Sequence, residues 1–79
     1  MIDLEEAIQI CEEADPNDDI IERYKYENTY YFMMRPKGLS EGEFFDTAMI
    51  SVDAETGEVG FTNYVKLIYD DIVDKLQKL

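Results

Sequence analysis

The sequence predicts one α+β domain, residues 1–79, with the element order α-β-β-β-β-α. Apolar residues recur at helical spacing near both ends of the chain. Between them, residues 20–36 are rich in aromatic strand formers, and residues 49–61 alternate with period two around a turn. We expect the four strands to form an antiparallel meander with two helices packed on one face.

Residues 3–14 predict the first helix. Asp3 can cap it, and Glu6 three residues later completes a pair like the capping box. Asp15-Pro16 ends the helix, because a residue before proline avoids the helical conformation. The stripe that we expect to be buried consists of Leu4, Ala7, Ile8, Cys11 and Ala14.

Residues 20–36 predict two strands joined by a turn at Glu27-Asn28-Thr29. The length of this turn is not fixed by the sequence, so the register of the hairpin stays open. The second strand, Tyr30 to Met34, is apolar on both faces. It is therefore either a central strand covered twice or one that exposes half of its side chains to a partner. Pro36 ends it, and residues 37–43 form a loop.

The third and fourth strands, Phe44 to Asp53 and Glu58 to Thr62, predict a hairpin. Its turn contains Asp53, whose carboxylate can accept backbone N–H bonds, Thr56, and Gly57, which suits a left-handed position. If Asp53 pairs with Glu58, five residues share the face toward the helices: Ala48, Ile50, Val52, Val59 and Phe61. The opposite face would carry Phe45, Thr47, Met49 and Ser51, with either Tyr31 and Met33 or their neighbours.

The second helix is predicted from Tyr64 to about Lys78, with Asn63 as its cap. Leu67 falls off the apolar stripe of this helix, and we expect it to face solvent. The stripe that we expect to be buried is Val65, Ile68, Tyr69, Ile72, Leu76 and Leu79.

Acidic residues dominate the charge of the chain, with 19 Asp and Glu against seven Lys and Arg, for a net charge of −12. This charge opposes non-specific binding to nucleic acid or to an anionic membrane, and it favours a basic protein partner. Solubility alone is the alternative explanation. The first 19 residues hold no Lys or Arg and eight acidic residues: Asp3, Glu5, Glu6, Glu12, Glu13, Asp15, Asp18 and Asp19.

The residue types argue against an enzyme or a metal protein. The chain has no His, which removes a Ser-His or Cys-His nucleophile and the usual zinc ligands. Cys11, the only cysteine, fits a small buried hydrophobe. The segment from Asp15 to Asp19 opens like a calcium loop but lacks the glycine and glutamate that close one. We therefore expect no cofactor and no metal. With neither a signal peptide nor a transmembrane stretch in this sequence, we expect a cytoplasmic protein.

The hairpin motif Val52-Asp53-Ala54-Glu55-Thr56-Gly57-Glu58-Val59 resembles the V-D-x-x-T-G-E-V hairpin that closes PepSY-like α+β domains. The chain is also similar to small bacterial immunity proteins, which neutralise secreted polymorphic toxins. PepSY domains are usually exported or attached to a membrane, and this chain carries no signal, which favours the immunity type. The resemblance implies a non-enzymatic binding or inhibitory role, and it carries over no catalytic residue.

These observations predict an acidic binding or inhibitor protein that docks a basic protein partner. Two sets of residues are candidates for contact. The acidic set is Glu5, Glu12, Glu13, Asp15, Asp18 and Asp19, and the open-sheet set is Tyr31, Met33, Phe45 and Met49. Two alternatives stay open. The residues of the open-sheet set could instead fill the core or a homodimer interface. The acidic set could imitate DNA phosphates, as in a phage-encoded anti-defence protein that occupies a nucleic-acid-binding site.

Overall fold

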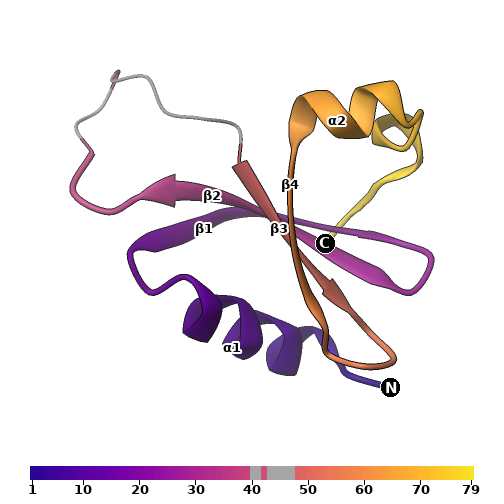
Figure 1. Ribbon diagram of the computed structural model, residues 1–79, viewed down its shortest axis with the longest axis horizontal. Helices are drawn as coiled ribbons and strands as arrows, with labels where there is room; N and C mark the ends of the chain where they lie inside the picture. The colour runs from indigo at the N-terminus through magenta and orange to yellow at the C-terminus, as the bar shows by residue number, and fades with distance from the viewer. Residues whose placement is uncertain (40–41, 43–47) are drawn as a thin grey trace.

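The computed structural model describes residues 1–39, 42 and 48–79. Its strands form one antiparallel sheet in the order β4-β3-β2-β1-β5 (Figure 1). The elements are α1 (Leu4–Ala14), β1 (Asp18–Tyr26), β2 (Thr29–Pro36), β3 (Ala48–Asp53), β4 (Val59–Asn63), α2 (Tyr64–Tyr69), the 3-10 helix η1 (Val73–Lys75) and β5 (Gln77–Lys78). The α+β class is confirmed, but the sheet that the described residues form has five strands where the sequence predicted four.

The hairpin of β3 and β4 has the register expected from the alternation, with Val52 opposite Val59 and Ile50 opposite Phe61. Asp53 Oδ1 accepts the backbone N–H of Glu55 at 2.7 Å and that of Thr56 at 3.2 Å. Gly57 has φ +77°, a conformation that is sterically unfavourable for residues that carry a Cβ. The predicted start of this third strand, residues 44–47, lies outside the described residues.

The hairpin of β1 and β2 turns through Glu27 and Asn28 alone, and Thr29 is already the first residue of β2. A bulge between Ile20 and Glu22 shifts the register of β1 and leaves Ile21 exposed. β2 is the central strand of the sheet. One of its faces is fully buried, and the other, which carries Tyr31 and Met33, is half-buried.

The main core lies between α1 and one face of the sheet. Asp3 caps α1, because its Oδ1 accepts the N–H of Glu6 at 2.9 Å. From α1, Ala7 and Cys11 are fully buried, and the Sγ of Cys11 lies 3.7 Å from the Sδ of Met34. The sheet contributes Tyr30, Phe32, Met34, Ile50 and Val52 to this core, and Ala54 joins from the turn.

The expectation that both helices pack on one face is wrong. α1 and α2 lie on opposite sides of the strands in Figure 1. Met49 and Leu67 are both buried, yet neither belongs to the core beneath α1. Because Asn63 is both the last residue of β4 and the cap of α2, no linker is available to carry the helix around the sheet edge. The sheet therefore has apolar residues buried on both faces.

The predicted course of the second helix is also wrong. α2 ends at Tyr69, and Asp71 takes a left-handed φ of 58°, after which the chain returns through η1 to pair β5 with β1. Leu67 is only 3% exposed, whereas Ile68 is 52% and Tyr69 85% exposed. A helix of fewer than two turns does not need the apolar stripe of a long helix, so a single inward side chain anchors it.

Two residues expected to face a helix stay exposed. Ala48 and Phe61 share the face of Ile50, but Phe61 is 75% exposed on the edge strand β4. The cover that α1 gives the sheet does not extend over them. Within the described part of the chain, no helix is long and apolar enough to cross a membrane.

Candidate acidic binding surface

α1 presents a row of carboxylates to solvent. Its buried side is taken by Ala7 and Cys11, so helical periodicity turns Glu5, Glu12 and Glu13 outward, and all three are exposed. In the described part of the chain, ion pairs within 4.0 Å join Lys37 to Asp19 and Lys78 to Glu22, and none reaches a carboxylate of α1. The negative charge of this helix is therefore not neutralised within the described residues.

A cavity of about 510 Å³ opens where α1 ends and β1 begins. Its apolar wall is formed by Ile8 of α1 and Ile20 of β1, with Pro16 between them in sequence. The polar residues that line it are Glu12, Asp15, Asp18, Asp19, Arg23 and Lys37. Apolar walls with carboxylates at the rim can take a long cationic side chain, whose methylene groups contact the walls while its charged head meets the acids.

Asp18 contributes to this cavity a carboxyl group whose pKa is perturbed. Its pKa is raised above the ordinary value of 3.8, first by a hydrogen bond with Asp15, then by partial burial and by the negative charges of Asp15 and Asp19. Two neighbouring carboxyl groups that share a hydrogen bond cannot both ionise without repulsion. A cation bound between them would remove this repulsion, because it stabilises both ionised groups.

The cavity already holds two cationic side chains of the protein itself. Lys37 Nζ lies 3.9 Å from Asp19 Oδ1, but both side chains are more than half exposed, so this ion pair contributes little. Lys37 comes into place through the pairing of Asp18 with Pro36 in the β1–β2 hairpin. Because the sequence left that register open, neither Lys37 nor Arg23 could be placed beside the acidic cluster beforehand.

The acidic candidates fall into two groups. Glu12, Asp15, Asp18 and Asp19 converge on the cavity, whereas Glu5 and Glu13 lie elsewhere on the exposed side of α1. The open-sheet set is not part of this surface. Tyr31 and Met33 lie on the opposite face from the α1 core, and Phe45 lies outside the described residues.

Met49 was expected to contact a partner, but it is only 1% exposed. A side chain buried to this extent cannot meet a partner in this structure, although Tyr31 and Met33 on the same face are half-buried. A shallower hollow of about 270 Å³ remains on the same face, where it is lined by Tyr31 and Ser51 together with turn residues Asp53 and Glu58. Its acid Asp53 already accepts the backbone N–H groups of Glu55 and Thr56, so the acidic surface is the better candidate site.

Cys11 is unsuited to nucleophilic chemistry. Its pKa is raised to about 12 by burial first, and then by the negative charges of Asp15 and Glu12. Such a thiol stays protonated near neutral pH and acts as part of the core. Among the described residues, no group of three or more His, Cys, Asp or Glu side chains is placed to hold a metal ion.

Comparisons of the chain with protein families, curated proteins and solved structures found no match. The resemblance to PepSY-like domains and immunity proteins therefore stays a prediction that depends on the hairpin motif of residues 52–59. The chemistry of the surface itself is the basis for assigning a function.

Proposed function

We propose that this protein is a non-enzymatic binding or inhibitor protein of the immunity type, which docks a basic protein through the acidic surface of α1 and the adjoining cavity. The observation that carries the proposal is the cavity itself. It combines an apolar wall with four acids, Glu12, Asp15, Asp18 and Asp19, against two bases, Arg23 and Lys37. The pKa of Asp18 is raised by its acidic neighbours. This combination is suited to a lysine or arginine side chain of a partner.

The position of the charges supports binding rather than folding. Glu12 and Glu13 lie in the last turn of α1, where the helix dipole disfavours negative charge, and Asp15 caps that end. The last turn holds no basic residue that would offset this cost. A basic partner would remove the repulsion, so that charge unfavourable in the isolated protein becomes favourable in the complex.

The cavity beside α1 favours a protein partner over imitation of DNA. A DNA mimic presents its carboxylates as a surface that replaces phosphates in a nucleic-acid channel. Here the carboxylates surround a cavity with Ile8 and Ile20 on its wall, which provides apolar contact for one inserted side chain. We expect arginine or lysine side chains of the partner to carry most of the recognition.

Charge reversal on α1 tests this proposal. A partner is first captured with the wild-type protein, and association rates are then measured against ionic strength. The variant Glu5→Lys, Glu12→Lys, Glu13→Lys changes only exposed positions. We expect its association to slow by about tenfold or more, and wild-type association to weaken with salt, because exposed charges are screened beyond about 10 Å at ~0.1 M salt.

A matched control changes the same total charge elsewhere. Glu27→Lys, Asp70→Lys, Asp74→Lys also alters three exposed acidic residues, all outside α1 and the cavity. We expect it to associate faster than the α1 variant. Equal rates for the two variants would show that net charge alone acts, and unchanged rates for the α1 variant would exclude α1 as the docking surface.

A further inference from the structure

The strand β4 forms one edge of the sheet, and no described residue pairs with its outer side. The N–H of Asp53 donates to the carbonyl of Glu58 at 2.9 Å, which fixes the alternation of bonds along the hairpin. In an antiparallel pair, alternate residues bond to the neighbouring strand. Gly60 and Thr62 therefore bond inward to β3, while the N–H and C=O groups of Val59 and Phe61 point outward.

The two edges of this sheet differ in their protection against pairing with another chain. On the far side, the open half of β1 has a bulge and the charged residues Asp18, Asp19, Glu22 and Arg23, while β5 covers its other half. β4 has the sequence VGFTN, with no charge, no proline and no bulge in its register. Its central residue, Phe61, is 75% exposed.

We propose that β4 pairs antiparallel with β4 of a second copy, around a two-fold axis at Phe61. In that register Phe61 lies opposite Phe61, and Val59 lies opposite Asn63. These are the positions whose backbone groups point outward, so the hydrogen bonds of both copies are satisfied together. The two five-stranded sheets become one continuous sheet, and the exposed Phe61 rings meet on the same face.

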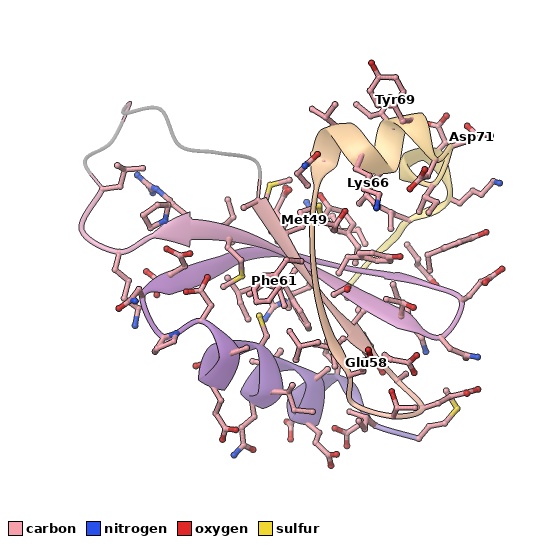
Figure 2. The ribbon with its side chains drawn as sticks, in the orientation of Figure 1. Met49, Glu58, Phe61, Lys66, Tyr69 and Asp71 are labelled. Carbon is pink, nitrogen blue, oxygen red and sulfur yellow. The ribbon has the colours of Figure 1, made fainter. Side chains whose placement is uncertain are left out.

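Charge along this edge favours a second copy as the occupant. Glu58 precedes the axis and Lys66 follows it, and Figure 2 shows the two side chains at opposite ends of the β4 edge, with Phe61 labelled between them. The two-fold axis brings Glu58 of one copy toward Lys66 of the other, twice. Lys66 makes no ion pair within the described residues. For a protein with a net charge of −12, an uncharged strand with one acid and one base beside it is the edge least opposed to self-association.

The first test measures mass in solution, by light scattering or sedimentation across a range of concentrations. We expect a dimer of the wild type that dissociates on dilution. Phe61→Lys places two positive charges opposite each other, and we expect it to raise the dissociation constant by at least about tenfold. Tyr69→Lys is the matched control, because Tyr69 is also exposed but points away from β4 (Figure 2), and it should stay dimeric. A monomeric wild type, or a Phe61→Lys dimer of unchanged strength, would overturn the proposal.

A second test needs no disruptive charge. The Cα atoms of a hydrogen-bonded antiparallel pair lie about 5.5 Å apart, which is within the range of a disulfide. Phe61→Cys should therefore form a covalent dimer under mild oxidation, whereas Tyr69→Cys should not, and the buried Cys11 does not compete. Equal crosslinking of both variants would contradict the axis. This inference depends on β4 and not on α1, so its failure leaves the proposed function in place.

Discussion

The backbone N–H of Ile2 donates a 2.7 Å hydrogen bond to the carbonyl of Ala54, which lies in the turn between β3 and β4. The hydroxyl of Tyr30 donates to the carbonyl of Ile2 at 3.2 Å, and Ala54 is fully buried. The segment before α1 is therefore attached to the hairpin turn by a backbone hydrogen bond and to β2 by the side chain of Tyr30. A substitution in this turn should consequently also affect the packing of the first residues of the chain.

Gly57→Ala should destabilise the fold by about 1 kcal/mol or more. Gly57 has φ +77°, and a Cβ there would lie 2.9 Å from Cδ1 of Ile2. Gly38→Ala is the control, because Gly38 has φ +76° with no atom within 4 Å of the added Cβ. Urea unfolding of both variants separates backbone strain from crowding against Ile2. A Gly57→Ala variant as stable as the wild type would contradict the left-handed turn.

Leu67→Ala should lower the free energy of unfolding by about 2–5 kcal/mol, because it removes the buried anchor of α2. Ile68→Ala, at the next position, is the control. Its side chain is half exposed, so we expect a cost of about 0.5–1 kcal/mol. Chemical denaturation of both variants checks the order. If Ile68 proves the costlier of the two, the stripe expected from the sequence is correct and the placement of α2 is wrong.

Asp18→Asn should stabilise the fold at about pH 7. The folded-state pKa of Asp18 lies above its ordinary value of 3.8, so the folded form holds this proton more tightly. The protonated Asp18 therefore contributes to the free energy of unfolding at a pH below its ordinary pKa, and this contribution is lost as the pH rises through its folded-state pKa. Melting temperatures measured from acid to neutral pH should be higher for Asp18→Asn than for the wild type at neutral pH, and this difference should disappear in acid. Glu5→Gln, near the N-terminus of α1, removes the same charge and should give no gain.

The sequence predicted the features of the fold that local pattern determines. The register of the β3–β4 hairpin follows from period-two alternation and from a turn with Asp53 and Gly57 at its ends. It did not predict β5, because Gln77 and Lys78 have no strand pattern and pair only where the chain is brought back to β1. The sequence also did not predict the end of α2, because Asp71 takes a left-handed conformation that its residue type does not require.

The candidate site was predictable as a set of exposed acids but not as a cavity. Helical periodicity suffices to turn Glu12 outward on α1. The approach of Lys37 to Asp19, in contrast, depends on the length of the β1–β2 turn, which several residue choices permit. The burial of Met49, on the face of the sheet opposite the α1 core, depends on tertiary packing that no local signal specifies.

The acidic surface of α1 forms only when the rest of the domain has folded. An isolated helix of 11 residues is marginal in water, and the acidic last turn of α1 weakens it further. Its buried residues Ala7 and Cys11 belong to the same core as Ile50 and Val52 of β3, so the helix gains its support only after the long chain segment between them has closed into a loop. A peptide of residues 1–19 alone should therefore lack the acidic surface. If a partner binds α1 as proposed, it selects the fully folded domain, and its binding should raise the stability of every element at once by mass action.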